Sequence, residues 1–212
     1  MRQTTVRTVS VAALLALGSI PAHAARPFFT DDARVVDQGH CQLETFYKEQ
    51  RSYSGSEFWF LPACNPFGAE FTVAGNRIEG DRNVIAQAKF LLKPLPTNGV
   101  GYAMSVGTFG GEPFFNTIGS ASFLNDRVVL HGNLGSFRDG GGTWGVGLEA
   151  LLAAPRVYAI LESFGQHRET PTYHYGIRFW VIPNRFQIDT TRGDQTGVAA
   201  RSFYTVGLRF IF

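Results

Sequence analysis

The sequence lacks an apolar run long enough to cross a membrane as a helix. Its longest such run, residues 11–20, spans about ten residues, whereas a transmembrane helix needs roughly 18 to 20. Charged residues are scarce, at 17% of the chain, compared with about a quarter in soluble domains. Long segments with the periodicity of an amphipathic helix are also missing after residue 24. These absences exclude a helical membrane protein and disfavour a soluble helical domain.

The chain also lacks a strong charge of either sign. Its formal net charge is +2, and Arg2 and Arg7 lie in an N-terminal segment that we expect to be removed. Basic and acidic residues are then equal in number. A basic excess that would attract nucleic acid is missing, so we predict no nucleic-acid partner.

The N-terminus has the order of features found in a secretory signal peptide. Arg2 and Arg7 precede the short apolar run, and Ala-His-Ala at 22–24 forms a small-residue cleavage site. We predict a cleaved signal peptide over 1–24, an extended periplasmic lead segment over 25–40, and a β-barrel over 41–212. The acidic pair Asp31 and Asp32 shows no alternation around it, and we expect these carboxylates to be solvated rather than to hold a cation.

What the sequence has in abundance is glycine (24 residues) and phenylalanine (19 residues), arranged in alternating stretches. Alternation is strictest over residues 204–212, where large apolar residues occupy one face and Thr205, Gly207 and Arg209 the other. Three aromatic residues of this stretch resemble the C-terminal signal read by the bacterial barrel-insertion machinery: Tyr204, Phe210 and Phe212. The alternative is an edge strand of a soluble sheet.

Alternating segments recur roughly every 10 to 15 residues from Cys41 onward, with turn residues between them. The candidate strands are 41–49, 57–61, 68–74, 83–92, 100–109, 114–123, 128–137, 143–153, 156–165, 173–182, 186–192 and 202–212. This pattern predicts an all-β fold, a transmembrane antiparallel β-barrel of about 12 strands. A periplasmic soluble β-sandwich is the alternative. Outer-membrane lipid is then the surrounding solvent, and the insertion machinery a partner.

The connections between these segments alternate in character. Those at 62–67, 93–99, 125–126, 154–155 and 183–184 are tight, and most contain proline. The intervening connections are polar and several are longer, which predicts short periplasmic turns and longer outer loops. This assignment brings Cys41 and Cys64 to the same end of one hairpin. Because the chain is exported, we predict that these cysteines form a disulfide.

The face opposite the apolar one carries most of the charge. The predicted lumen-lining residues are Glu44, Lys48, Gln87, Lys89, His131, Asn133, Glu149, Glu162, His174, Arg178, Gln187, Asp189 and Arg209. Charges of alternating sign fall on successive strands, which predicts cross-strand ion pairing. Two interpretations stay open: the pairs fill the barrel interior, or they line a constriction that selects solutes.

Motifs for catalysis, cofactors and metals were tested in turn. Residues 145–150 match G-x-G-x-x-A, but these glycines lie within a predicted strand, whereas a dinucleotide site needs a following helix. His131 and His174 are interpreted as lone lumen residues. A lipid-modifying enzyme would need a serine beside a histidine, and the odd spacing of His131 and Ser136 puts them on opposite faces. We predict no catalytic residues, no metal and no cofactor.

Three stretches resemble the outer-membrane transporter family of the phenol meta-degradation pathway type, the MetA-pathway-like β-barrels. They are R-P-F-F-T-D-D-A at 26–33 followed by Q-L-E at 42–44, L-P-A-C-N-P at 61–66, and the fourteen-residue stretch at 176–189. The resemblance implies a barrel that passes small solutes, including aromatic or hydrophobic ones. The expected function is therefore passive diffusion through a polar lumen. A closed structural or surface-interaction barrel is the alternative.

Overall fold

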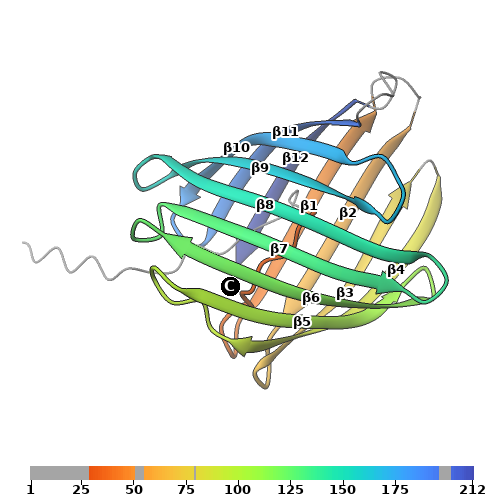
Figure 1. Cartoon of the computed structure of the whole chain (residues 1–212), viewed down its shortest axis with the longest axis horizontal. Helices are drawn as coiled ribbons and strands as arrows, with labels where there is room; N and C mark the ends of the chain where they lie inside the picture. Colours follow the sequence, from red (N-terminus) through yellow and green to blue (C-terminus); the bar gives the residue numbers. More distant parts are fainter. Residues whose placement is uncertain (1–28, 51–54, 79, 196–201) are drawn as a thin grey trace, which may run out of the picture.

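The computed structural model describes residues 29–50, 55–78, 80–195 and 202–212, which form a β-barrel preceded by a short irregular segment (Figure 1). The strands are β1 (Cys41–Gln50), β2 (Ser56–Cys64), β3 (Ala69–Ile78), β4 (Asp81–Lys93), β5 (Val100–Phe109), β6 (Glu112–Phe123), β7 (Val128–Phe137), β8 (Gly141–Ala153), β9 (Val157–Gln166), β10 (Thr172–Ile182), β11 (Phe186–Gln195) and β12 (Phe203–Ile211). Every predicted strand is present, most of them extended by a few residues. The predicted signal peptide lies outside the described residues.

Each strand pairs antiparallel with its neighbours in sequence, and β1 pairs with β12 to close the sheet. Glu44 of β1 lies opposite Arg209 of β12 at this closure. The prediction of an all-β, antiparallel barrel of about 12 strands is confirmed, and the soluble β-sandwich is wrong because the sheet has no free edge. Within the described ranges, no helix combines the length and apolar character needed to cross a membrane.

The outer surface of the barrel is apolar. Because side chains alternate across a strand, every second residue points outward, and on β12 these are Tyr204 and its apolar neighbours. Tyr204 is 45% exposed, and Phe212, which follows β12, is 60% exposed, so the described residues leave this face open. Other outward residues are Phe58, Phe60, Phe90, Leu130, Leu134, Val146, Ile177 and Phe179. An apolar outer belt of this kind is suited to a hydrocarbon environment.

The barrel interior is less uniformly polar than the alternation predicts. Inward apolar side chains of β1 to β4 form a cluster of Phe46, Trp59, Leu61, Ala74 and Ile85. The same four strands also carry buried polar and charged residues, such as Glu44, Glu70 and Lys89. The interior therefore combines a packed apolar cluster with polar groups on the same strands.

The two ends of the barrel have connections of similar length, contrary to the predicted asymmetry. At the end opposite the cysteines, β5 turns into β6 through Gly110 and Gly111 alone. Both adopt positive φ, 58° and 89°, a conformation that glycine tolerates without steric cost. Strands therefore extend into regions predicted to be loops. We call the end that carries Cys41 and Cys64 the disulfide end, and the other the vestibule end.

Strand β2 runs through Pro62, where the sequence predicts a turn. The ladder to β3 pairs Phe60 with Gly75 and then Ala63 with Thr72, skipping Leu61 and Pro62. Proline has no N–H to donate, so it fits a strand at a position where the ladder is interrupted.

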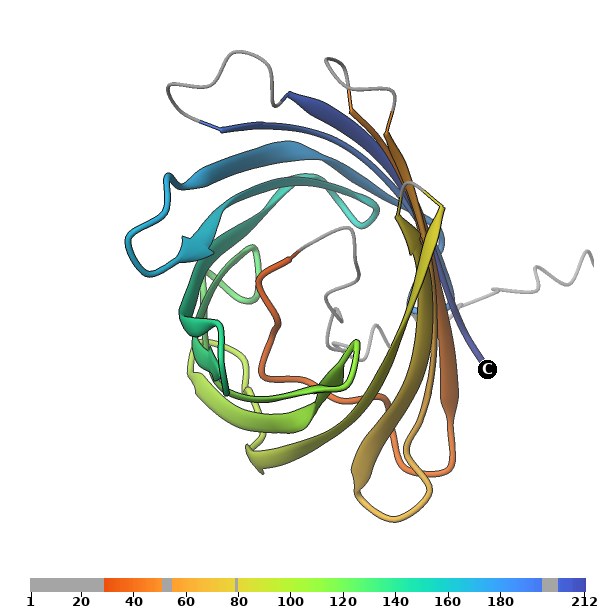
Figure 2. The ribbon, with the colours of Figure 1, turned by 90° about the vertical axis from the view of Figure 1, so that its right-hand side faces the viewer.

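The segment that precedes β1 lies inside the barrel. Figure 2 looks into the ring of strands and shows the orange-red chain after residue 28 crossing the interior before it reaches β1. We call residues 29–36 the lumen segment. The sequence predicts residues 25–40 to be a lead outside the barrel, and the structure instead places Thr30, Asp32, Ala33 and Val36 at 4% exposure or less. Asp32 is accordingly not solvated as predicted, and the Asp31 side chain is partly covered, with 23% of it exposed.

Candidate functional site

The lumen segment is held by wall side chains that accept its backbone N–H groups. Glu162 of β9 accepts from Phe29 at 2.9 Å and from Thr30 at 2.7 Å. Further along, Asn133 of β7, Ser120 of β6 and Glu70 of β3 accept from Asp31, Ala33 and Val36. Buried N–H groups of irregular chain need such partners. The wall therefore supplies what a β-ladder would otherwise provide.

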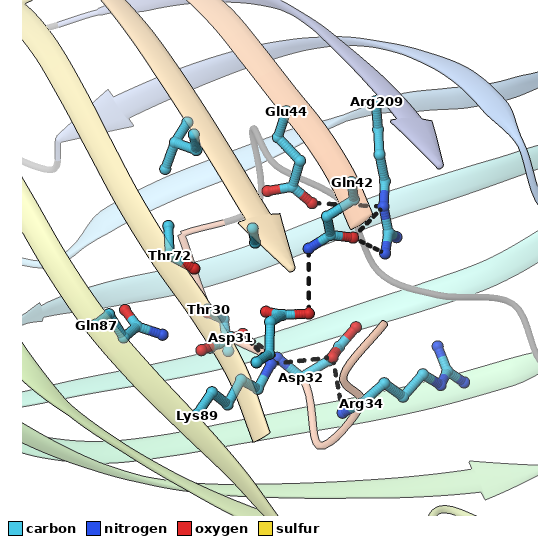
Figure 3. Close-up of a pocket in the computed structure, with 13 residues that line it drawn as sticks. Thr30, Asp31, Asp32, Arg34, Gln42, Glu44, Thr72, Gln87, Lys89 and Arg209 are labelled. Carbon is cyan, nitrogen blue, oxygen red and sulfur yellow. Dashed lines mark hydrogen bonds and ion pairs between the residues drawn. The ribbon is translucent and has the colours of Figure 1, made fainter. Parts of the chain in front are cut away.

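Lys89 of β4 binds the acidic side chains of the lumen segment. Its Nζ lies 2.7 Å from Asp31 Oδ1 and 3.5 Å from Asp32 Oδ1, and the lysine side chain is 4% exposed (Figure 3). Buried charges persist in proteins when they are paired. Asp31 and Asp32 thus supply the counter-charges that permit a buried lysine in the wall.

Gly145 of β8 has no side chain, and the lumen segment packs in the space that a side chain would fill. A Cβ atom at this position would lie 2.8 Å from Thr30 Oγ1 and 3.4 Å from Thr30 Cβ. Non-bonded carbon atoms normally stay about 3.5 Å or more apart. The glycine of the rejected dinucleotide motif is therefore explained by packing.

The predicted ion-pair band is present in part. Arg178 of β10 binds Asp189 of β11 at 3.1 Å, and Arg209 lies 3.5 Å from Glu44, as the alternating signs predict. The series of alternating charges does not extend to Glu162 of β9. Arg178 instead binds Glu149 at 2.8 Å, because its neighbour on β9 is Tyr158.

Glu162 pairs with His174, which lies directly opposite it on β10. The Glu162 Oε1 to His174 Nδ1 distance is 2.5 Å, and Thr191 contacts the other ring nitrogen at 2.5 Å. His174 is therefore part of a chain of hydrogen bonds rather than a lone lumen group.

His131 has a similar arrangement. Ser120 Oγ lies 2.8 Å from His131 Nδ1, and Glu149 Oε1 lies 3.4 Å from Nε2. A serine, histidine and carboxylate in this order are the groups of a hydrolytic triad. Here, however, Ser120 Oγ already accepts the Ala33 N–H, and the serine is 4% exposed. The lumen segment therefore occupies the position that a substrate would need.

The structure gives a position for every predicted lumen residue. The side chains of all thirteen residues point inward or are largely covered by the rest of the barrel. One of them, Lys48, forms an ion pair with Glu57 across the β1–β2 hairpin at 2.7 Å. Sequence reasoning missed a second set of inward polar residues, namely Gln42, Glu57, Glu70, Ser105, Ser120 and Thr191. Extending the two-residue alternation to every strand would have found them. Among the described residues, no group of three or more histidine, cysteine, aspartate or glutamate side chains could hold a metal ion.

Two cavities lie on either side of the lumen segment. The one toward the disulfide end has a volume of about 50 Å³ and is lined mainly by polar residues, including Gln42, Glu70 and Arg209 (Figure 3). The one at the vestibule end has a volume of about 460 Å³. Asp31 and Gln87 line both cavities. The lumen segment therefore divides the described interior in two.

The larger cavity, which we call the vestibule, is lined by aromatic rings. The inward-facing ones are Phe29, Trp59, Phe109, Phe114, Phe137 and Phe164. Trp59 stacks between Phe46 and Phe109, with ring centroids 5.3 Å and 6.1 Å apart, and Phe29 stacks on Phe164 at 4.6 Å. Amide and hydroxyl groups of Gln87, Ser105 and Asn116 lie among them. Apolar walls with a few polar groups are typical of sites for small organic molecules.

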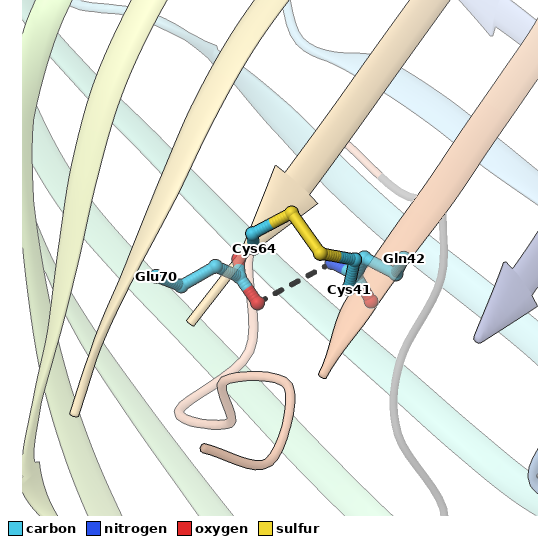
Figure 4. The surroundings of a disulfide bond; sticks show 4 residues. All are labelled: Cys41, Gln42, Cys64 and Glu70. Carbon is cyan, nitrogen blue, oxygen red and sulfur yellow. Dashed lines mark hydrogen bonds between the residues drawn. A yellow bond between two sulfur atoms is a disulfide. The ribbon is translucent and has the colours of Figure 1, made fainter. Parts of the chain in front are cut away.

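The predicted disulfide is present. Cys41 and Cys64 are opposite neighbours in the β1–β2 ladder, and their sulfur atoms are bonded at 2.08 Å (Figure 4). Beside the bond, the Gln42 amide donates to Glu70 at 3.4 Å. The same Glu70 carboxylate holds the Val36 N–H. The disulfide end is thereby connected to the lumen segment.

The fold is similar to that of solved outer-membrane porins. A KdgM porin matches with a TM-score of 0.62 and 12% identity, covering 81% of this chain and 99% of that one. A NanC porin matches with a TM-score of 0.57 and 7% identity over 81% and 98%. Omp33 of Acinetobacter baumannii matches at 0.54 and 9% over 82% and 98%.

At such low identities these similarities establish the fold alone. A search of curated protein sequences finds no match. A family model does match, over residues 12–212. The chain therefore belongs to the family described as "Uncharacterised conserved protein UCP029691".

Proposed function

We propose that this chain is an outer-membrane channel that passes small, uncharged solutes, aromatic ones among them, by passive diffusion. The aromatic vestibule is the observation that carries the proposal. Rings stacked along the wall offer apolar faces to a planar solute, while neighbouring amides replace its lost hydrogen bonds to water. Diffusion of this kind needs no cofactor and no catalytic residue. The resemblance to the phenol meta-pathway family favours the same solutes.

The charge of the vestibule favours neutral over anionic solutes. Among the described residues that line it, the charged ones are Asp31, whose charge Lys89 balances, and Glu169, which is also acidic. A similar KdgM porin has been solved in complex with disordered oligogalacturonate. An anionic sugar of that kind would meet repulsion in the vestibule of this chain.

The proposed location is the bacterial outer membrane, with the disulfide end in the periplasm. The apolar outer belt requires lipid, and outer-membrane barrels begin and end on the periplasmic side. Disulfides form in that compartment. The outward Tyr204, Phe210 and Phe212 of β12 are the residues we propose that the insertion machinery recognises.

A closed structural or surface-interaction barrel is the second candidate. The presence of the lumen segment and the buried ion pairs favours it, because both reduce the open cross-section. Conductance decides between the two: a channel conducts in planar bilayers, whereas a closed barrel inserts without carrying current.

Swelling of liposomes loaded with the refolded protein tests the solute preference. Phenyl glucoside and methyl glucoside are suitable probes because they share a sugar that crosses lipid slowly and differ in the ring. We expect faster swelling with phenyl glucoside, although it is larger. Trp59→Ala should abolish this preference, whereas Phe60→Ala, at the next and outward position of β2, should keep it. Equal rates for both sugars, unaffected by Trp59→Ala, would refute the aromatic preference.

A further inference from the structure

We propose that the lumen segment is the constriction of this channel and that Lys89 holds it in place. In this arrangement one wall lysine sets the size of the solutes that pass. The inference rests on the proposed function, and its tests below separate the failure of one from the failure of the other.

The first step in the argument is that the wall is built to hold this segment. Side chains from four strands, β9, β7, β6 and β3, accept five of its N–H groups. In return the Asn133 amide donates to the Asp31 carbonyl at 2.7 Å, and the Asn65 amide donates to the Val36 carbonyl at 2.7 Å. A segment lying in the lumen by chance would not meet a matched partner at each of these positions.

The second step is the position of the segment in the lumen. The vestibule and the smaller cavity lie on opposite sides of it and share Asp31 and Gln87 in their linings. A solute that leaves the vestibule toward the disulfide end must therefore pass the segment. The smaller cavity, at about 50 Å³, has room for little more than one or two waters.

The third step is electrostatic. Two wall acceptors of the segment, Glu162 and Glu70, are carboxylates, and the segment itself carries Asp31 and Asp32 as well as the basic Arg34. Glu162 is paired with His174. Lys89 is the wall residue whose ammonium group lies within 3.5 Å of both aspartates. Removing that ammonium leaves buried carboxylates facing one another, which is strongly unfavourable. The segment can relieve the repulsion by leaving the wall.

Two variants displace the segment by independent means. Lys89→Met removes the ion pairs while keeping the length of the side chain. Gly145→Val places a branched side chain where Thr30 now packs. The matched controls are Arg192→Met, which breaks an ion pair of 3.0 Å within β11, and Gly132→Val, at a β7 position with no neighbouring atom within 4 Å of an added Cβ.

The first measurement is single-channel conductance in planar bilayers, with the exclusion limit for polyethylene glycols of graded size. We expect both displacing variants to raise the conductance several-fold and to admit larger polymers. The controls should resemble the wild type. If the wild type conducts and neither displacing variant differs from it, the segment is not the constriction.

The second measurement is hydrogen exchange of the peptide that covers residues 29–36, which needs no transport. Lys89→Met should speed its exchange about tenfold, the change expected for loss of one charge-assisted contact, and Arg192→Met should not. A third outcome is that exchange is accelerated and the displacing variants conduct, but the wild type does not. In that case the segment is the constriction, and the wild type is a closed barrel. If none of the proteins conducts, passive diffusion is refuted and the constriction with it. If exchange does not change, the role of Lys89 is refuted.

Discussion

At the scale of single residues, the interior depends on charges that are buried and paired. Arg178 is 1% exposed and lies between Glu149 and Asp189, at 2.8 Å and 3.1 Å. Gln187 donates to the same aspartate at 2.9 Å. The desolvation cost of these groups is offset only while all of them are present.

We expect Arg178→Met to lower the free energy of unfolding by about 3–5 kcal/mol, because it leaves two buried carboxylates without their partner. The measurement is urea-induced unfolding of the refolded protein in detergent micelles. Arg192→Met is the matched control, since Arg192 binds Asp194 at 3.0 Å but the two side chains are 37% and 40% exposed. An exposed pair contributes about 0–1 kcal/mol. Equal losses in the two variants would contradict the argument.

The sequence predicted which residues face inward only on strands with strong alternation. His131 and His174 were placed on the correct face, but their partners were not foreseen. Ser120 and Glu149 reach His131 from β6 and β8, the strands on either side of it. Such triplets become visible only once the register between neighbouring strands is known. Alternation identifies the inward face, but a slip of two residues keeps the same face and changes which residues lie opposite one another.

At the scale of elements, the β1–β2 hairpin and its disulfide stabilise the start of the sheet. Cys41 and Cys64 are separated by 23 positions. Closing a loop of this length reduces the entropy of the unfolded chain, corresponding to about 3 kcal/mol of stability in the chain-entropy estimate.

We therefore expect the double variant Cys41→Ser, Cys64→Ser to fold but to unfold at lower temperature. To measure this, samples of both proteins are heated to graded temperatures and run on SDS gels. The folded and unfolded forms migrate differently, so the gels give the temperature at which each protein unfolds. Added reductant should lower the transition temperature of the wild type to that of the variant and leave the variant unchanged. A variant as heat-resistant as the oxidised wild type would show that strand pairing alone holds the hairpin.

Strands could be predicted from the sequence far better than the connections or the lumen segment. Alternation reports burial on one face, and it marked every strand from β1 to β12. The turns were misjudged because pairs such as Gly110 and Gly111 allow tight reversals where a longer loop was expected. Residues 29–36 have no periodic pattern, and their partners come from four strands that meet only when the barrel closes.

At the scale of the whole molecule, the barrel combines an apolar exterior with an interior divided between a packed apolar cluster, paired charges and the lumen segment. The sequence predicts the exterior and the closure. It does not predict how full the interior is, because that depends on a segment whose contacts with the wall are long-range. The same fold can therefore be wide or nearly closed, depending on residues outside the strands.

The exterior gives the last prediction. Val146 of β8 points outward and is 56% exposed, whereas Thr143 of the same strand lines the vestibule. An arginine on the lipid face near the bilayer midplane costs about 2–4 kcal/mol, and one facing a water-filled lumen costs much less. Val146→Arg should therefore reduce the free energy of folding into phosphatidylcholine bilayers by this amount, while Thr143→Arg should change it by less than half as much. If the two variants were equally stable in bilayers, the outer belt would not face lipid, and the channel proposal would lose its physical basis.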